Sequence, residues 1–423
     1  MNYMILPNLI ALAILVGVFW AISRKASNDR LDLWLAGWFL VLLHFFAQFL
    51  TPVGQASNRV LTTISLDALI LAGTAFLISV SVVGSITTRR FQLLLAIGLP
   101  CVVYADACIW NISSRTFYYA VIAAGVVAPV VLVWRFNQKS ALFASVMTAG
   151  TALAGLLMAR AVYLGASDAG IIVLLAALYF VTAALYWRHH QRASAGVLTA
   201  IIGFVLWGAV FPLGALLSVY APNLKIESEV WNIPKYLVAV GMILTLLESQ
   251  IQRSTYLAYH DELTGLPNRR LLDDRLERAL AFANRAGQKV AVLQLDLDRF
   301  KEVNDTFGHR VGDLALQGVV ARLAARIRNA DTLARSGGDE FTVVSVVHDR
   351  ASASVLVSHL EDALSAPMNI EGVPVQTGLS IGVALYPEDG SNADELHAAA
   401  DKAMYIAKRA ARCLVSSDVA QLN

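Results

Sequence analysis

Residues 332–346 read TLARSGGDEFTVVSV, a pattern that predicts two β-strands joined by a tight turn. Apolar and β-branched residues flank the pair Gly337-Gly338, as is typical of a β-hairpin. The acidic pair Asp339-Glu340 directly follows the glycines, so the predicted hairpin presents two carboxylates at its turn. Two adjacent glycines also leave the backbone open to close approach by a ligand.

The segments around this hairpin alternate between strand-like and helix-like patterns. Apolar, β-prone runs predict strands over residues 289–297 and 373–386. Apolar residues at helical spacing predict helices over residues 311–329, 351–366 and 392–409. This order predicts an α+β domain in which helices pack on a central, mostly antiparallel sheet.

The composition of the chain changes near residue 250. Residues 1–250 carry 14 Lys or Arg and 8 Asp or Glu, whereas residues 251–423 carry 19 and 23. The first part is about 9% charged and the second about 24%, compared with roughly 25% in soluble domains. We therefore predict a membrane region over residues 1–248, a helical linker over 249–258 and a soluble domain over 259–423. This contrast excludes a single soluble enzyme and a disordered chain, and three cysteines exclude a disulfide scaffold.

The membrane region contains nine runs that approach the roughly 20 apolar residues needed to cross a bilayer. They lie near residues 4–23, 31–50, 61–84, 91–110, 116–134, 141–164, 169–187, 194–219 and 233–248. With the N-terminus outside, the inside loops hold nine basic residues and the outside loops and span ends hold five. The positive-inside rule therefore predicts a multi-pass protein whose residues from 249 onward lie in the cytoplasm.

Two acidic residues, Asp67 and Asp106, fall inside predicted spans. A charge is costly there, so one hypothesis is a ligand, ion or proton site that faces the bundle interior. The alternative is a carboxyl near a helix end or hydrogen-bonded to a neighbouring helix.

Residues 251–423 carry a net charge of −4, which argues against nucleic acid as a partner.

A nucleotide site is suggested by the residue types in the soluble domain. Mg²⁺ prefers hard oxygen ligands, and Asp296 at the end of a predicted buried strand offers a carboxylate, as do Asp339 and Glu340. Adjacent strands would bring these carboxylates together. Cations that could balance phosphate groups are also present: Lys301, Lys408 and Arg412.

Several motifs together resemble the GGDEF family, the diguanylate cyclases. Residues 335–341 (RSGGDEF) contain the family's full signature, and residues 261–269 (DELTGLPNR) are similar to its opening segment. Residues 296–301 (DLDRFK), 304–309 (NDTFGH) and 312–313 (GD) are similar to its metal and guanine segment, and 400–405 (ADKAMY) to its closing helix. The resemblance covers about residues 258–415 and none of the first 245.

This resemblance implies a palm-like α+β cytoplasmic domain that condenses two GTP into cyclic di-GMP and two pyrophosphates. Each subunit of a homodimer would hold one GTP and two Mg²⁺ or Mn²⁺ ions. Asp296, Leu297 (through its carbonyl), Asp339 and Glu340 would bind metal, with Asp339 and Glu340 in the catalytic role. The substrate-binding residues would be Asn304 and Asp313 at the guanine, and Gly337, Gly338, Phe300, Lys301, Lys408 and Arg412 at or near the triphosphate.

The resemblance also implies an inhibitory site for the product. Arg328 and Asp331 have the spacing of the family's RxxD motif, and five residues separate Asp331 from Gly337. The alternative is that they solvate a helix end. Where the family usually has Gly and Asn around the final arginine, this chain has Ala411 and Cys413, which bears on the geometry of Arg412.

Two functions remain open from the sequence. The first is a diguanylate cyclase in the bacterial cytoplasmic membrane, in contact with lipid, whose spans sense a signal. The second is a receptor-like or transporter-like membrane protein whose GGDEF domain only senses nucleotide. The intact acidic signature favours the first.

Overall fold

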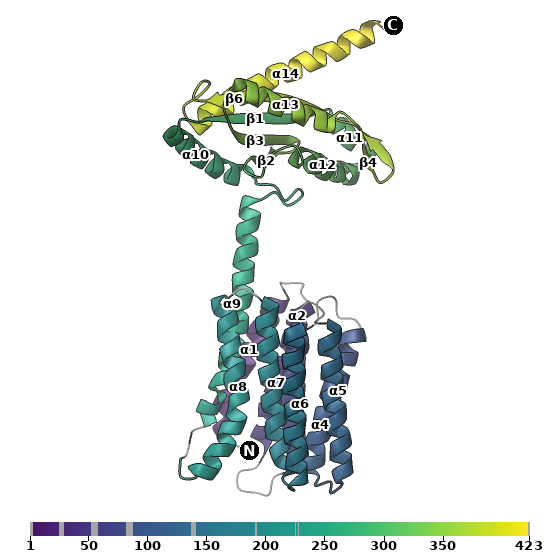
Figure 1. The fold of residues 1–423 in the computed structure, drawn as a ribbon, viewed down its shortest axis with the longest axis vertical. Helices are drawn as coiled ribbons and strands as arrows, with labels where there is room; N and C mark the ends of the chain where they lie inside the picture. Colours follow the sequence, from purple (N-terminus) through teal and green to yellow (C-terminus); the bar gives the residue numbers. More distant parts are fainter. Residues whose placement is uncertain are drawn as a thin grey trace. The chain divides into compact units, whose positions relative to one another are not determined.

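The chain folds into two compact units. The computed structural model describes residues 3–24, 29–51, 58–81, 88–136, 141–190, 193–224, 226 and 228–421, with the backbone alone at some helix ends, including 411–421. The units are Met1–Ser249 and Gln250–Asn423 (Figure 1). Separate clusters of buried apolar side chains form the cores of the two units.

The N-terminal unit is a bundle of helices that run side by side (Figure 1). Seven helices are long and apolar enough to cross a membrane, by length and composition, and the described apolar parts of α4 and α5 are shorter. The nine apolar runs of the sequence are thus helical, while their insertion in a bilayer stays a prediction. The helices in the described residues are α1 (Leu6–Ser23), α2 (Asp29–Leu50), α3 (Arg59–Ser81), α4 (Thr88–Ile109), α5 (Arg115–Phe136), α6 (Ala141–Tyr163), α7 (Ser167–His190), α8 (Ala195–Tyr220) and α9 (Ser228–Tyr259).

Aromatic side chains fill the centre of this bundle. Trp207 stacks on Tyr179 with ring centroids 4.2 Å apart, and Trp38 lies 5.3 Å from Phe76. All four rings are fully buried. Large apolar side chains such as Leu142 and Val219 instead point outward and are more than two-thirds exposed. An apolar exterior over an apolar core is what a helix bundle in lipid requires.

Helices α8 and α9 make an unusually close contact through glycines. A Cβ atom on Gly241 would lie 2.3 Å from the Ala200 backbone nitrogen, and one on Gly203 would lie 2.6 Å from that of Val238. Only residues without a side chain permit backbones to approach so closely, as is common between membrane helices. α8 and α9 are therefore held as a closely packed pair.

The C-terminal unit is built on a four-stranded antiparallel sheet with the order β2-β3-β1-β6. Its strands are β1 (Lys289–Asp298), β2 (Thr332–Gly337), β3 (Glu340–Val347) and β6 (Gly378–Tyr386). Strand β1 lies in the middle and is buried along most of its length. A separate hairpin pairs β4 (Met368–Ile370) with β5 (Val373–Val375).

Helices cover both faces of this sheet. Alternate residues of β1 point to opposite sides, so Leu293 and Leu295 join one core and Val290 and Val292 join the other. The first core is closed by α11 (Phe300–Phe307), α12 (His309–Ala324) and α13 (Arg350–Leu364). The second is closed by α10 (Arg269–Ala286) and α14 (Ala393–Gln421). The α+β prediction with an antiparallel sheet is confirmed.

Several element predictions need correction. The strand predicted over residues 373–386 is two strands, because the chain turns out of the β4–β5 hairpin and Thr377 bonds to the Asp298 carbonyl before β6 begins. Helix α12 ends at Ala324 rather than near residue 329. Helices α10 and α11 were not predicted. Helix α10 nevertheless has clear signals, an Asn268 side-chain cap and a left-handed Gly287 at its end.

Candidate nucleotide site

Three carboxylates gather at one end of the sheet. Asp296, near the end of β1, is directly opposite Glu340, the first residue of β3. Asp339 lies in the turn between β2 and β3, and its carbonyl accepts a hydrogen bond of 3.2 Å from the Leu297 N–H. The turn places Gly338 in a left-handed conformation with φ of 42°, which favours glycine. The predicted hairpin and its acidic turn are confirmed in the fold.

The most buried of these carboxylates is paired with a lysine. Asp296 is 4% exposed, and its Oδ1 lies 2.6 Å from the Nζ of Lys408 on α14. Helix α14 reaches this position because it lies directly on β6. A Cβ on Gly382 would come within 2.1 Å of the Ala400 carbonyl oxygen and the Met404 backbone nitrogen. The glycine thus permits the contact that brings Lys408 to Asp296.

The site holds more negative than positive charge. Partial burial raises the pKa of Glu340, and nearby carboxylates raise it further, while the Lys408 ammonium opposes them. The carboxylates concerned are those of Asp296, Asp339 and Asp401. Such an excess of negative charge at a protein surface is suited to a cation.

Arg335 holds the acidic turn in place through a hydrogen bond and an ion pair. Its guanidinium donates to the Gly338 carbonyl from Nε at 2.9 Å and pairs with Asp261 at 2.9 Å. Partial burial alone would raise the pKa of Asp261, but hydrogen bonds from Thr264 and Arg335 lower it. A pocket beside the turn is lined by Asp261 and Arg335 together with both glycines and two exposed arginines, Arg269 and Arg270. Asp261 and Arg335 stand within motifs of the sequence, but no role was predicted for them, although an arginine two residues before the glycines was a usable signal.

Helices α11 and α12 meet beside the end of β1 and bring two predicted guanine contacts together. A Cβ on Gly312 would lie 1.9 Å from the Asn304 Oδ1, so the glycine leaves room for that amide. Asp313 follows Gly312 and is exposed. The two polar groups therefore lie at one helix junction, open to solvent.

The start of α11 presents free backbone donors near Asp296. Arg299 adopts a left-handed conformation with φ of 57°, and no side chain caps the helix. The first N–H groups of a helix have no partner within it and attract anions. Phe300 is 5% exposed and packs into the core, while Lys301 is exposed. Phe300 can thus offer a ligand its backbone rather than its ring.

The predicted product-site pair lies in the turn between α12 and β2. The Asp331 carboxylate accepts a hydrogen bond of 2.9 Å from the Arg328 backbone N–H. The Arg328 side chain is exposed and makes no hydrogen bond to another described residue. The carboxylate is therefore used locally, while the guanidinium is available. The side chains of Arg412, Ala411 and Cys413 lie outside the described part of the chain.

Among the described residues, no three His, Cys, Asp or Glu side chains are arranged to hold a metal by themselves. The acidic end is thus an open set of oxygen donors rather than a cage. Mg²⁺ is commonly held in this way, by one or two carboxylates, water and substrate phosphates. The donor set of Asp296, Asp339 and Glu340 fits such an ion.

The two acidic residues of the helical unit come together. The side chains of Asp67 on α3 and Asp106 on α4 lie close enough to interact with each other. One oxygen of each carboxyl is buried and without a partner among the described residues. The pairing matches the alternative in which an acid bonds to a neighbouring helix, and it leaves the ligand hypothesis open.

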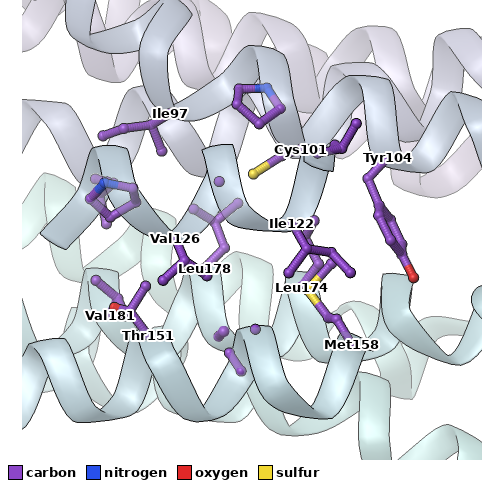
Figure 2. A pocket seen from close by; sticks show the side chains of 18 residues that line it. Ile97, Cys101, Tyr104, Ile122, Val126, Thr151, Met158, Leu174, Leu178 and Val181 are labelled. Atoms are coloured by element: carbon purple, nitrogen blue, oxygen red, sulfur yellow. The ribbon is translucent and has the colours of Figure 1, made fainter. Parts of the chain in front are cut away.

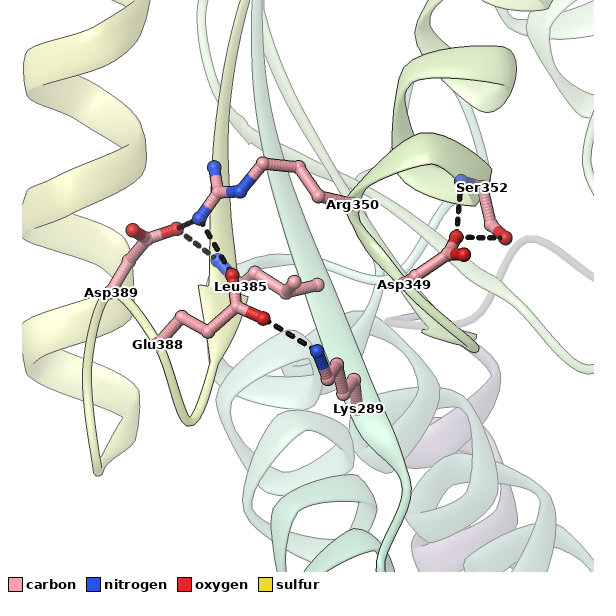
Figure 3. Close-up of polar contacts among 7 residues, drawn as sticks. All are labelled: Lys289, Asp349, Arg350, Ser352, Leu385, Glu388 and Asp389. Atoms are coloured by element: carbon pink, nitrogen blue, oxygen red, sulfur yellow. Dashed lines mark hydrogen bonds and ion pairs between the residues drawn. The ribbon is translucent and has the colours of Figure 1, made fainter.

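The opposite end of β1 carries a second polar cluster (Figure 3). The Lys289 ammonium is 2.6 Å from Glu388, and Arg350 contacts Glu388 at 3.2 Å and Asp389 at 2.6 Å. Asp389 also accepts a hydrogen bond of 2.8 Å from the Leu385 N–H. Each of these four charged side chains is paired with a side chain of opposite charge.

Comparison with known proteins agrees with this geometry. Residues 258–413 match the family model described as diguanylate cyclase, GGDEF domain. The bifunctional diguanylate cyclase/cyclic di-GMP phosphodiesterase MucR of Pseudomonas aeruginosa is 36% identical over 311 residues, covering 64% of this chain and 45% of MucR. Diguanylate cyclase TpbB of the same species is 44% identical over 168 residues, covering 39% of this chain and 38% of TpbB.

A solved structure is also similar. It holds the coiled coil and GGDEF domain of DgcB from Caulobacter crescentus in complex with c-di-GMP, with 25% identity and a TM-score of 0.39. The match covers 42% of this chain and 95% of that structure.

The fold defines an α+β domain with a cluster of carboxylates at one end of its sheet, and residues 258–413 of this domain match the model of the GGDEF domain of diguanylate cyclases. The chain spans less than half the length of MucR and of TpbB. The match to MucR covers more of the chain than the C-terminal unit provides, so it extends into the helical unit.

Proposed function

We propose that the protein is a membrane-bound diguanylate cyclase that joins two GTP molecules into cyclic di-GMP and releases two pyrophosphates. The observation that carries this proposal is the acidic turn at the end of the sheet. Asp339 and Glu340 lie beside Asp296, and the Lys408 ammonium pairs with Asp296. The family of residues 258–413 supports the same reaction.

The carboxylates of Asp296, Asp339 and Glu340 would hold Mg²⁺ or Mn²⁺, with the Leu297 carbonyl as a further oxygen. Bound metal would supply positive charge to the attacking and leaving oxygens of the phosphoryl transfer. The chain would supply mainly position, since phosphoryl transfer needs little covalent help from protein. Asp339, in the turn, is the candidate to accept the proton of the attacking 3′-hydroxyl, with Glu340 beside it.

The triphosphate would lie between the acidic turn and the start of α11. Backbone N–H groups of Phe300 and Lys301 would donate to phosphate oxygens, as helix N-termini commonly do. Gly337 and Gly338 have open space where a Cβ would be, so phosphate can approach the turn closely. Lys408 and Arg412 are the cations proposed for the outer phosphates.

Guanine recognition is assigned to the junction of α11 and α12. The Asp313 carboxylate accepts hydrogen bonds, which matches the N1–H and N2–H₂ donors of guanine. Asn304 can both donate and accept at the remaining edge. Adenine lacks these donors, so an unpaired carboxylate would disfavour ATP.

Each domain would hold one GTP, so synthesis would need two domains to face each other in a homodimer. The nine helices of the N-terminal unit would hold the protein in the bacterial cytoplasmic membrane, with the GGDEF domain in the cytoplasm.

Arg328 and Asp331 would bind the product and limit synthesis, because an arginine fork suits phosphate or guanine acceptors.

The test is turnover by the full-length protein in lipid nanodiscs. We expect GTP with Mg²⁺ to yield cyclic di-GMP, measured by mass spectrometry, and ATP to yield no cyclic product. Chelation of the metal should stop the reaction. Tight binding of GTP without any product would contradict the proposal and favour a nucleotide-sensing domain.

A further inference from the structure

Two of the pockets in the helical unit differ in character. The first, of about 110 Å³, lies among α3 to α7 and is lined by apolar side chains such as Ile97, Val126 and Leu174 (Figure 2). Its hydroxyl groups are already used, since Tyr104 donates to the Ser167 carbonyl and Thr151 to that of Met147. Nothing in its lining selects an occupant.

The second pocket has a volume of about 630 Å³ and is lined by residues of α1, α2, α3, α8 and α9. This size is in the range of small-molecule sites. Lys235 of α9 lines it, and the lining residues include no aspartate or glutamate. The pocket therefore offers a cation and no counter-charge.

Lys235 is deeply buried for a charged side chain. It is 9% exposed, and its ammonium donates a hydrogen bond to the Asn232 Oδ1. Two aromatic rings lie near the ammonium, with Nζ 4.9 Å from the centroid of Phe45 and 5.8 Å from that of Trp207. No ion pair joins Lys235 to another described residue. A buried ammonium without a counter-ion is unfavourable, and a lysine near a helix end could otherwise extend to water.

A second unused donor faces the same pocket. Asn8 of α1 is 4% exposed, and its Oδ1 accepts a hydrogen bond of 2.9 Å from the Tyr236 hydroxyl. Its Nδ2 is buried and has no partner among the described residues. Buried polar groups are nearly always hydrogen-bonded, so this N–H₂ also indicates a missing acceptor.

From these observations we infer that this pocket binds a small organic anion, with an anionic oxygen group between Lys235 and Asn8 and an apolar or aromatic body against Trp207 and its neighbours. A single lysine matches a single negative charge. The aromatic walls, which include Phe45, Phe211 and Trp207, match a flat or branched apolar body. The anionic group could be the carboxylate of a free acid or the phosphate of a lipid.

The experiment measures binding rather than catalysis, so its outcome is independent of the proposed cyclase activity. All eight tryptophans lie before residue 250, and Trp207 and Trp231 line this pocket. The full-length protein in phosphatidylcholine nanodiscs is titrated with benzoate at neutral pH, with tryptophan emission and calorimetry as readouts. Benzamide, which has the same shape without the charge, is the control ligand. We expect saturable binding of benzoate and none of benzamide.

Variants connect this response to the lysine. K235M keeps the length of the side chain and removes its charge, and should weaken benzoate binding by roughly 10- to 100-fold, as expected for a charge-assisted hydrogen bond. Its thermal unfolding without benzoate should not be lowered, because an apolar residue often replaces a buried charge at no cost. N8L should weaken binding less. R160Q removes an exposed arginine of α6 and should leave binding unchanged.

Nanodiscs that contain phosphatidylglycerol distinguish the two sources of the anion. Suppression of the benzoate response by phosphatidylglycerol, to the same extent in wild type and in R160Q, would support the phosphate of an anionic lipid as occupant. An unchanged response would support a free acid. The inference is overturned if wild type shows no saturable response to benzoate, or if K235M responds as wild type does, or if benzamide binds equally well.

Discussion

The two ends of strand β1 carry polar clusters that differ in their balance of charge. At the first end, Lys289 and Arg350 face Glu388 and Asp389, so the charges balance (Figure 3). At the other end, several carboxylates surround Asp296, which has Lys408 as its cationic partner. The two ends belong to one strand of one sheet, yet among the described residues the second end is the one with an excess of negative charge.

This difference separates a structural role from a binding role. Exposed ion pairs such as those of Arg350, whose side chain is 51% exposed, contribute little to stability. An unbalanced acidic cluster costs stability in the empty protein, and that cost is recovered when a cation binds. Substitutions at the two ends should therefore have opposite consequences for activity and for stability.

The largest effect is expected from the matched pair Asp339→Asn and Asp389→Asn. Asp339→Asn should lower cyclic di-GMP production by roughly 1000-fold, because it weakens the charge stabilisation at the reacting phosphate. Asp389→Asn should leave production within about twofold, since the balanced end touches no substrate in the proposed reaction. Initial rates of full-length protein in nanodiscs test both, and equal losses in the two variants would remove the distinction.

Gly382→Ala tests how Lys408 reaches the acidic end. The new methyl group would meet the α14 backbone, so the helix must shift, at a cost of about 1–3 kcal/mol in stability. We expect synthesis to fall by roughly 10- to 100-fold, since small displacements at an active site are costly. The C-terminal unit has no tryptophan, so hydrogen exchange in β1 and β6 is the measure of its stability. Full activity in a normally folded variant would contradict the role of this contact.

A smaller loss is expected when the acidic turn is released. Arg335→Gln removes the bonds to the Gly338 carbonyl and to Asp261 and should lower activity by about tenfold through misplacement of the turn. Arg350→Gln removes an arginine that pairs with two carboxylates, Glu388 and Asp389, at the balanced end. The comparison fails if the two variants have the same kcat, measured with saturating GTP.

The smallest effect concerns stability against pH in the metal-free protein. The pKa of Glu340 is raised in the folded state, so its ionisation disfavours folding, and this penalty develops as pH rises from the unfolded value of about 4.5 through the folded value. Glu340→Gln should therefore slow hydrogen exchange of β3 slightly at neutral pH and have no effect near pH 4. A slower exchange that was independent of pH would point to a cause other than charge.

The sequence predicted the acidic end well and its surroundings less well. The carboxylates at Asp296, Asp339 and Glu340 belong to short motifs on a strand and its neighbouring hairpin, and antiparallel pairing brings such ends together regardless of distance along the chain. The ion pair with Lys408 could not be predicted, because it depends on how closely α14 lies on Gly382. Lys235, at the start of the predicted span 233–248, was counted only among the five basic residues of the outside loops and span ends. Its burial depends on rings from other helices, which periodicity along one helix does not reveal.

The pairing of Lys408 with Asp296 has a consequence for the order of binding events. In the empty site the ammonium serves as an internal counter-ion, so a divalent cation alone must compete with it for Asp296. A nucleotide would offer its phosphates to the same ammonium and leave Asp296 to the cation. The two ligands would then favour each other's binding by an equal free energy, as linkage requires. We expect the affinity for Mn²⁺, followed by electron paramagnetic resonance, to increase when a non-reactive GTP analogue is present, and this increase to disappear in Lys408→Met. The protein would thus respond to the metal–nucleotide complex as one ligand rather than to either component alone.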